Sequence, residues 1–219
     1  MTNKSANGIT VLFDVDGTLL DTVPLIVRTY QYVFCTFLGH PVDEAEILAS
    51  IGTPLDVMFE QYDHDQAERM IQLYLDYCSR HTDTGIGIFL AVPRLLRMLA
   101  ERGCRLGIVT SKRRVSAMQS LSVFDLAKSF EVIITRESTQ KHKPSPEPVL
   151  EAMRQLGVTD PSRVVFVGDS LHDLNCAKNV GCRSVIVDWT AMPAEELRQA
   201  LPDLWLERPE QLVDYLARI

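Results

Sequence analysis

The sequence lacks several features that mark specialised classes of protein. It contains no uninterrupted run of about 18 apolar residues, which excludes a transmembrane helix. None of the five cysteines forms a C-x-x-C pair and their number is odd, so neither a zinc site nor a disulfide framework is expected. Positive charge is in the minority, with 22 Lys and Arg against 29 Asp and Glu. This balance disfavours a protein that binds nucleic acid or an anionic membrane surface.

The polar N-terminal segment 1–8 has no apolar core of a signal peptide, so we expect no secretion by that route. Together with the unpaired cysteines, this predicts a cytoplasmic protein. Hydrophobic residues make up 46% of the chain, which is enough apolar material for a core and too much for a disordered chain. The length of 219 residues suits one large domain, or one domain with an insertion.

Five short apolar runs alternate with helical patterns along most of the chain. Runs of this kind suit strands buried on both faces, and the alternation predicts a parallel sheet with right-handed crossovers. We therefore expect an α/β fold with a Rossmann-like parallel sheet between helices. The predicted strands are Ile9–Phe13, Arg105–Thr110, Phe130–Ile134, Val164–Gly168 and Ser184–Val187. The predicted helices are Ala91–Arg102, Arg113–Leu121, Pro146–Leu156 and Leu171–Val180.

The stretch from Asp21 to about Gly87 breaks this alternation. It contains no convincing strand, and its apolar residues recur at helical spacing. We expect a small all-helical cap domain at residues 20–87, inserted into a Rossmann-like core made of residues 1–19 and 88–219. Asp21 is expected to cap the first helix of the insertion. The candidate hinges are Gly85, Gly87 and residues 18–22.

Reactive side chains follow the predicted strands, and open parallel sheets place their ligands beyond the carboxyl ends of the strands. These residues are Asp14, Asp16, Thr110, Ser111, Lys143, Asp169, Ser170 and Asp173. Four carboxylates beside one lysine cannot all stay ionised without a partner, so one carries a proton or a cation binds. Oxygen ligands suit a hard cation, and a few carboxylates with water and a phosphate suit Mg²⁺. Such a site would attract a phosphate dianion.

Four short motifs occur in a fixed order along the chain. The first is Asp14-x-Asp16-Gly17-Thr18-Leu19-x-Asp21, and the others are Thr110-Ser111, Lys143-Pro144 and Gly168-Asp169-Ser170-x-x-Asp173. In sequence and order they resemble the four motifs of the haloacid dehalogenase superfamily, and the resemblance covers essentially the whole chain. Within the superfamily the chain is most similar to phosphoglycolate phosphatases and related pyrophosphatases, whose cap loop resembles Ile51–Leu55.

The resemblance implies a role for each motif residue. Asp14 is the implied nucleophile, which forms an aspartyl-phosphate. Asp16 is the implied general acid and then base, and crowding by other acids would favour its protonated form. The implied phosphate-binding residues are Gly17, Thr110, Ser111 and Lys143. The implied Mg²⁺ ligands are Asp14, the main-chain carbonyl of Asp16, and Asp169. Asp173 is the implied outer partner, which orients Lys143 or a metal-bound water, and Gly52, Thr53 and Arg28 are the cap residues nominated for substrate specificity.

Two of these residues also have a purely structural interpretation, Ser170 as a helix N-cap and Asp173 as an acid at a helix start. The prediction is a Mg²⁺-dependent phosphatase that hydrolyses a small phosphomonoester, phosphoglycolate-like, under a closing cap. The alternatives are an inorganic pyrophosphatase or a sugar-phosphate mutase on the same core, or a non-catalytic binding module. The expected partner is a small phosphorylated metabolite, neither nucleic acid nor a membrane is expected, and both a monomer and a homodimer remain open.

Overall fold

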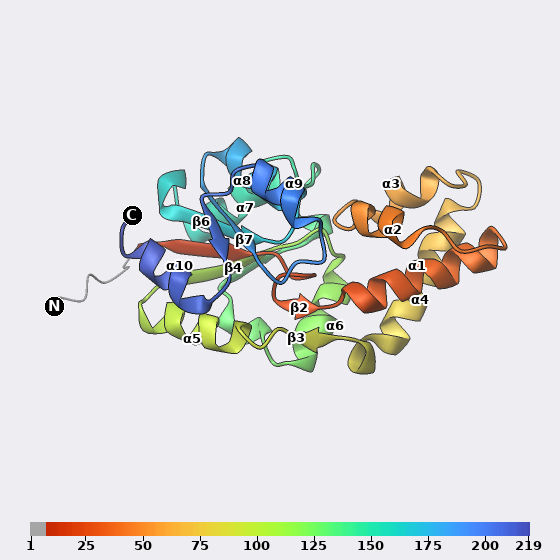
Figure 1. Ribbon diagram of the computed structural model, residues 1–219, viewed down its shortest axis with the longest axis horizontal. Helices are drawn as coiled ribbons and strands as arrows, with labels where there is room; N and C mark the ends of the chain where they lie inside the picture. The colour runs from red at the N-terminus through yellow and green to blue at the C-terminus, as the bar shows by residue number, and fades with distance from the viewer. Residues whose placement is uncertain (1–7) are drawn as a thin grey trace.

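The structure is a computed structural model that describes residues 8–219. Residues 1–7, on which most of the argument against secretion depends, lie outside the described residues. Figure 1 shows a sheet covered by helices and, at one end, a helical insert, with the C-terminus at the opposite end. Within residues 8–219, none of the helices combines the length and the apolar character that a membrane span requires.

Six parallel strands form the main sheet in the order β5-β4-β1-β6-β7-β8. Their bounds are β1 Thr10–Phe13, β4 Arg105–Val109, β5 Val132–Ile134, β6 Val164–Gly168, β7 Arg183–Val187 and β8 Leu204–Leu206. The chain builds outward from β1 through β4 to β5, then returns to the other side of β1 for β6, β7 and β8. The carboxyl end of β1 therefore lies where the direction of strand addition reverses, which is the usual ligand position in open α/β sheets.

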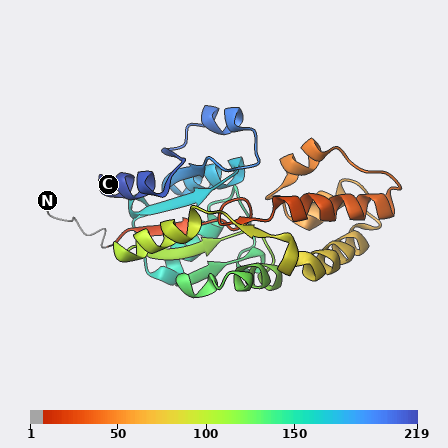
Figure 2. The same cartoon turned by 60° about the horizontal axis from the view of Figure 1, so that its bottom comes forward.

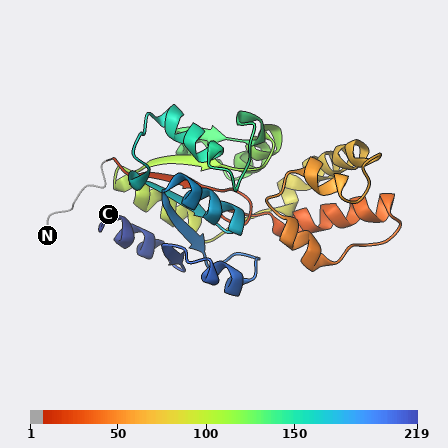
Figure 3. The same ribbon diagram turned by 90° about the horizontal axis from the view of Figure 1, so that it is seen from above.

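Helices cover both faces of the sheet, as the view in Figure 3 shows. Side chains alternate across a strand, so Val11 and Phe13 face one layer and Leu12 faces the other. The first layer contains α5 (Val92–Glu101) and α10 (Pro209–Leu216), whereas α7 (Glu147–Leu156) and α8 (Leu171–Val180) form the second. The remaining helices of this part are α6 (Arg114–Val123) and α9 (Ala194–Gln199), with short 3-10 turns at Ala127–Ser129, Arg136–Ser138 and Pro161–Arg163.

Four helices form the insert, and they pack around their own hydrophobic cluster. They are α1 (Val23–Phe37), α2 (Glu44–Ser50), α3 (Leu55–Glu60) and α4 (Ala67–Gly85). Aromatic rings dominate this cluster: the centroid of Tyr30 lies 5.4 Å from that of Phe59 and 4.8 Å from that of Tyr74. Figure 2 shows that the insert projects beyond one end of the sheet.

The predicted fold class is confirmed, and each predicted strand and helix has a counterpart at nearly the predicted position. The expectation of no strand between Asp21 and Gly87 is wrong at both ends. There β2 (Leu20–Asp21) pairs antiparallel with β3 (Gly87–Ile88), at the base of the insert. The expectation that Asp21 caps the first insert helix is also wrong, because Asp21 lies in β2 and Thr22 occupies the N-cap position of α1.

Candidate active site

Asp14 comes directly after β1, at the reversal point of the sheet. Its N–H donates to the Val167 carbonyl of β6 (2.9 Å), so the pairing of β1 with β6 sets the direction of its side chain. Asp14 is only 7% exposed. The Lys143 ammonium lies 3.0 Å from Asp14 Oδ1 and 2.6 Å from Asp173 Oδ1, and it is buried itself. A single buried cation thus bridges two buried carboxylates.

Asp169 follows β6, next to Asp14 in the sheet. Its Oδ1 accepts a hydrogen bond from Thr18 Oγ1 (3.2 Å), whereas its Oδ2 is buried and accepts none from residues 8–219. Oδ2 lies against Gly17, where a Cβ would come within 2.2 Å of it. Gly17 has φ +75°, so glycine permits both the left-handed backbone and this close approach. A buried carboxylate oxygen without a protein partner is costly unless a cation takes that place.

Three carboxylates, those of Asp14, Asp169 and Asp173, offer oxygens that all lie within 4.8 Å of one another. Asp173 already has protein partners on both oxygens. Its Oδ1 accepts from Lys143, and its Oδ2 accepts from Ser170 Oγ (2.6 Å) and from the N–H groups of Ser170 and Asp169. Asp14 and Asp169 are therefore the carboxylates left for a cation, and such a set of hard oxygen donors fits Mg²⁺.

The electrostatics of this buried cluster also favour a cation. Burial raises the pKa of Asp14 from 3.8 to about 7, with Asp173 and Asp16 adding to the effect and Lys143 opposing it. Burial, then the neighbouring carboxylates, raise the pKa of Asp169 well above its usual range. Burial alone would lower the pKa of Lys143, but Asp14 and Asp173 outweigh burial and raise it, so the ammonium stays charged. A divalent cation would relieve the remaining repulsion between the carboxylates.

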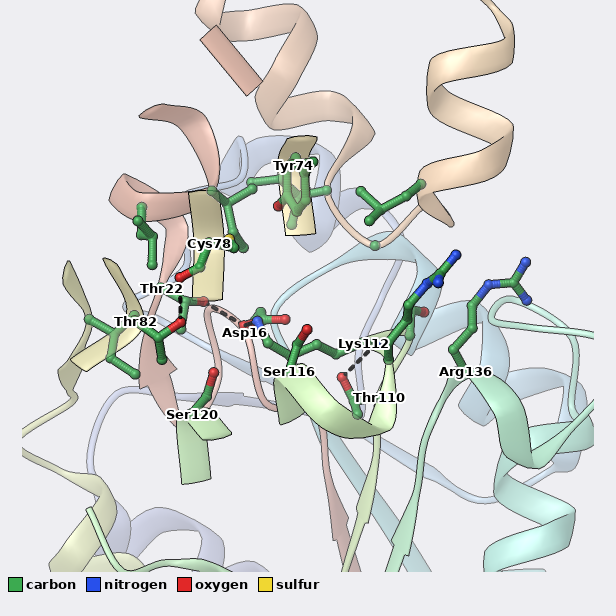
Figure 4. A pocket seen from close by; sticks show the side chains of 18 of the residues that line it. Asp16, Thr22, Tyr74, Cys78, Thr82, Thr110, Lys112, Ser116, Ser120 and Arg136 are labelled. Atoms are coloured by element: carbon green, nitrogen blue, oxygen red, sulfur yellow. Dashed lines mark hydrogen bonds and ion pairs between the residues drawn. The ribbon is translucent and has the colours of Figure 1, made fainter. Parts of the chain in front are cut away.

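Asp16 is held differently from the other acids. Its Oδ1 accepts hydrogen bonds from Thr22 Oγ1 (2.7 Å) and from Lys112 Nζ (2.8 Å), as Figure 4 shows. The sequence predicted that Asp16 would be crowded by acids, and the structure instead brings an ammonium group into direct contact with it. Burial would lower the pKa of Lys112, but Asp16 raises it above its usual range. The Lys112 ammonium therefore stays charged.

The residues predicted to hold phosphate lie around this cluster. Thr110 and Ser111 follow β4, and Thr110 Oγ1 accepts from the N–H of Lys112 (3.2 Å). The hydroxyl of Ser111 is buried and has no hydrogen-bond partner in the part of the chain that the structure describes, so it is available to a ligand oxygen. Lys143 lies behind Asp14, against the ring of Phe166 at 5.7 Å. Ser170 is the N-cap of α8 and its hydroxyl accepts from the N–H of Asp173, which matches the structural interpretation.

A pocket opens above these residues, between the sheet edge and the insert. Figure 4 shows Tyr74, Cys78 and Thr82 of the insert facing Asp16 and Lys112. The charged residues that line the pocket are Asp14, Asp16, Lys112, Arg113, Arg136 and Asp169. The apolar and aromatic residues of the insert that line the pocket are Leu25, Ile26, Tyr30, Ile51, Leu55, Tyr74, Leu75 and Ile86. Among the described residues, every charged side chain that lines the pocket therefore comes from outside the insert.

The nominated specificity residues are only partly brought to this pocket. Gly52 and Thr53 line it, whereas Arg28 does not and lies instead beside Gly85. Sequence reasoning missed contacts that join the insert to the rest of the protein. Arg136 donates to both carboxylate oxygens of Asp56 in α3 (2.9 and 2.7 Å). On α6, Gln119 Nε2 donates to the Ser79 carbonyl of α4 (2.8 Å), so hydrogen bonds hold both α3 and α4 of the insert.

Comparison with known proteins agrees with this geometry. A family model described as haloacid dehalogenase-like hydrolase matches residues 11–187. A relative from Bacillus pumilus named Pyrophosphatase PpaX is 36% identical over 204 residues, which is 93% of this chain and 94% of the relative.

Two solved structures share the fold. The crystal structure of a predicted phosphatase from Clostridium acetobutylicum has a TM-score of 0.82 at 25% identity, over 96% of this chain and 99% of that one. The structure of a predicted phosphoglycolate phosphatase from Haemophilus somnus has a TM-score of 0.82 at 21% identity, over 98% and 99% of the two chains. The family model covers most of the sequence, and the named relative aligns along nearly its whole length. The chain therefore belongs to the haloacid dehalogenase-like hydrolase family.

Proposed function

We propose that the protein is a Mg²⁺-dependent phosphatase that hydrolyses a small phosphorylated metabolite through an aspartyl-phosphate on Asp14. The observation that carries this proposal is the arrangement at the reversal point of the sheet. A buried carboxylate, Asp14, is paired with Lys143 and lies close to Asp169, whose Oδ2 has no hydrogen-bond partner within residues 8–219. This arrangement supports the proposal because a carboxylate that could attack phosphorus, a fixed positive charge and an oxygen that could bind Mg²⁺ lie close together.

In the proposed reaction, a carboxylate oxygen of Asp14 attacks phosphorus and the bond from phosphorus to the leaving oxygen breaks. Asp16 gives its proton to that oxygen. Asp16 then takes a proton from a water molecule, which attacks the phosphoryl group and releases phosphate and the free Asp14 carboxylate. Asp14, Asp169 and the Asp16 main-chain carbonyl would hold Mg²⁺, which supplies positive charge that offsets the repulsion between the phosphoryl group and the carboxylate.

The other residues bind and enclose the phosphoryl group in this proposal. The free hydroxyl of Ser111, the Thr110 hydroxyl and the Lys143 ammonium would hold its oxygens, with the Gly17 backbone alongside. We propose residues 1–19 and 88–219 as the catalytic core and residues 20–87 as the cap, with β2 and β3 at the boundary. Closure of the cap would exclude bulk water during the reaction.

For the substrate, we take a phosphomonoester of the phosphoglycolate class as the first candidate and inorganic pyrophosphate as the second. Both carry a second anionic group next to the phosphoryl group, and Lys112, Arg113 and Arg136 line the pocket where that group would lie. The relative named Pyrophosphatase PpaX supports the second candidate. Gly52 and Thr53 are the proposed specificity residues of the cap. We also propose a cytoplasmic location for the protein.

A phosphate-release screen tests this function. The purified chain is incubated with Mg²⁺ and each of phosphoglycolate, several other small phosphate esters and pyrophosphate. We expect release from at least one anionic substrate and a phosphoryl adduct on Asp14 in rapidly quenched samples, detected by mass spectrometry. Release of phosphate from none of them, or an adduct on a different residue, would overturn the proposal.

A further inference from the structure

Asp169 has four polar groups on its main chain and side chain, and the protein holds three of them. Thr18 Oγ1 donates to Oδ1 (3.2 Å), and the Asp169 N–H donates to Asp173 Oδ2 (3.2 Å). The Asp169 carbonyl accepts from Thr190 Oγ1 (2.8 Å). Oδ2 is buried, and it is the one of the four groups that has no hydrogen-bond partner among the described residues. The direction of this free oxygen is therefore set by the groups that hold the rest of the residue.

Thr190 is the one of these partners that the four sequence motifs do not include. Its hydroxyl makes two hydrogen bonds at once, because it donates to the Asp169 carbonyl and accepts from the N–H of Met192 (2.9 Å). The accepted bond fixes where the hydroxyl oxygen lies, so its proton has a definite direction toward Asp169. A threonine hydroxyl locked in this way acts as a rigid spacer between two stretches of main chain.

The preceding residue holds the other side of the same site. Trp189 Nε1 donates to the Thr18 carbonyl (3.0 Å), and Thr18 is the residue whose hydroxyl binds Asp169 Oδ1. Neighbouring residues of one segment thus support Asp169 both directly and through Thr18. Two hydrogen bonds from adjacent residues to two points of one site constrain orientation better than either bond alone.

The same segment, residues 189–192, also contacts the base of the insert and the insert itself. The ring of Trp189 packs against that of Phe89, just after β3, with centroids 5.8 Å apart. Met192 packs against the hydrophobic cluster of the four insert helices. A displacement of the insert would therefore reach the hydroxyl of Thr190 through the Met192 N–H, two residues away.

We propose that Thr190 is a positioning residue of the Mg²⁺ site: its hydroxyl, held by Met192, orients Asp169 so that Oδ2 faces the cation. This inference rests on the proposed function, because it requires Mg²⁺ at Asp14 and Asp169. Thr190 touches neither substrate nor metal and acts only through Asp169. Loss of such an outer hydrogen bond typically weakens metal binding by about 10-fold to 100-fold, whereas the ligand itself remains present.

The experiment measures Mg²⁺ binding to the full chain without substrate, by the Mg²⁺-dependent rise in Tm and by titration calorimetry. Thr190→Val removes the hydroxyl and keeps the size of the side chain, and Thr190→Ser keeps the hydroxyl. We expect Thr190→Val to raise the Kd for Mg²⁺ by about 10-fold, and Thr190→Ser to bind like the wild type. Thr36→Val is the matched control, because Thr36 is exposed on the insert and its hydroxyl donates to the Tyr32 carbonyl of its own helix.

Equal Mg²⁺ affinity in the wild type and Thr190→Val would overturn the inference while leaving the proposed function intact. Equal loss in Thr190→Ser and Thr190→Val would also overturn it, because the methyl packing and not the hydroxyl would then matter. If Thr190→Val folds poorly, Trp189→Phe removes the bond to Thr18 and should weaken Mg²⁺ binding in the same direction. A wild type that binds no Mg²⁺ would overturn both the inference and the metal site of the proposed function.

Discussion

The two walls of the pocket differ in the kind of side chain that they present. The wall at the sheet edge carries buried or half-buried charges, with Asp14 and Asp169 beside Lys143, and Asp16 beside Lys112. The wall formed by the insert presents aliphatic and aromatic groups and hydroxyls, such as Ile26, Tyr74 and Thr53. The sheet and the insert, which carry the two walls, are also packed by separate hydrophobic clusters.

The difference between the two walls matches two requirements of phosphoryl transfer, rigid stabilisation of charge and release of the product. Charges that stabilise a reacting phosphoryl group must be held rigidly, and a sheet edge supported by two layers of helices does this. A wall that must release product benefits from weaker, uncharged contacts that cost little to break. Changes on the charged wall should therefore alter the rate of the chemical step, whereas changes on the uncharged wall should alter which substrate is used.

The largest effect is expected at Asp14. Asp14→Asn keeps the shape of the side chain but replaces a carboxylate with a far poorer nucleophile, so kcat should fall by at least about 1000-fold, or about 4 kcal/mol in activation free energy. Steady-state phosphate release measures the change. Asp214→Asn, an exposed exchange of the same type in α10, is the control and should keep full activity. A variant at Asp14 that kept more than about a tenth of the wild-type kcat would contradict the nucleophile assignment.

Asp16→Asn should be the next most damaging change, and its effect should depend on the leaving group. With alkyl phosphates, both proton transfers are impaired, and a loss of about 100-fold or more is expected. With an aryl phosphate the first step needs little proton donation, so phosphoryl-enzyme should accumulate on Asp14. Intact-mass spectra of quenched samples report the adduct. Wild-type turnover of alkyl phosphates by this variant would show that Asp16 is not the acid.

Mg²⁺ binding should strengthen as the pH rises from about 5 to about 8, because the pKa of Asp14 is about 7 and the ion must displace that proton. Below that pKa the apparent affinity should fall by up to about 10-fold per pH unit. Without metal the folded state holds the proton more tightly than the unfolded state does. Protonated Asp14 therefore increases the free energy of unfolding. This increase is complete below about pH 4 and is lost as the pH rises through about 7.

Calorimetric titration with Mg²⁺ at several pH values checks the first part, and Tm of the metal-free chain against pH checks the second. The two curves should run in opposite directions over the same pH range. An Mg²⁺ affinity that does not change across that range would mean that Asp14 is not a ligand. Excess chelator should abolish phosphate release at every pH.

A change on the uncharged wall should alter substrate choice and leave phosphate binding unchanged. Thr53→Phe places a bulky ring in the loop Ile51–Leu55. We expect it to change the ratio of the kcat/KM values for phosphoglycolate and pyrophosphate, by an amount that corresponds to about 1–3 kcal/mol in relative activation free energy. Inhibition by free phosphate should stay unchanged, because the proposed phosphate-binding residues all lie outside the insert. Thr53→Ser is the matched control. Equal losses for all substrates, with a parallel loss of phosphate affinity, would assign a structural role to this loop.

The smallest effect is expected at the ion pair that joins the walls. Arg136 is 23% exposed and Asp56 is 43% exposed, so their interaction is worth at most about 1 kcal/mol and should weaken in salt. Arg136→Gln should lower kcat/KM only a few-fold at low ionic strength, and the difference from the wild type should vanish at high salt. Asp56→Asn should behave alike, and the double variant should add no further loss. Additive losses would show that the two residues act separately.

The difference between the walls also explains what could be predicted from the sequence. The strand ends of a parallel sheet are visible as apolar runs that stop at polar residues, so the position of Asp14 and Asp169 on one edge followed from the local pattern. The strand β8 was missed because it is three residues long and only partly buried. The strands β2 and β3 have two residues each, too few for any periodicity.

Contacts between distant segments could not be predicted in the same way. Trp189 and Thr18 are 171 positions apart, and Lys112 and Asp16 are 96 apart. Nothing in a window of ten or fifteen residues says which of several lysines and arginines reaches a given carboxylate. Lys112 stands in the stretch that follows β4, but its pairing with Asp16 requires the packed structure.

The short pair of β2 and β3 has a consequence for how such a protein can change over evolutionary time. Leu20 lies opposite Ile88 and Asp21 opposite Gly87, so the inserted chain leaves and returns at points only about 5 Å apart. The cost of closing a loop between fixed ends rises by only about 0.6 kcal/mol for each doubling of its length. Recombination between positions 21 and 87 could therefore replace the entire substrate-facing wall in one event. The charged wall, and the reaction it supports, would be inherited unchanged.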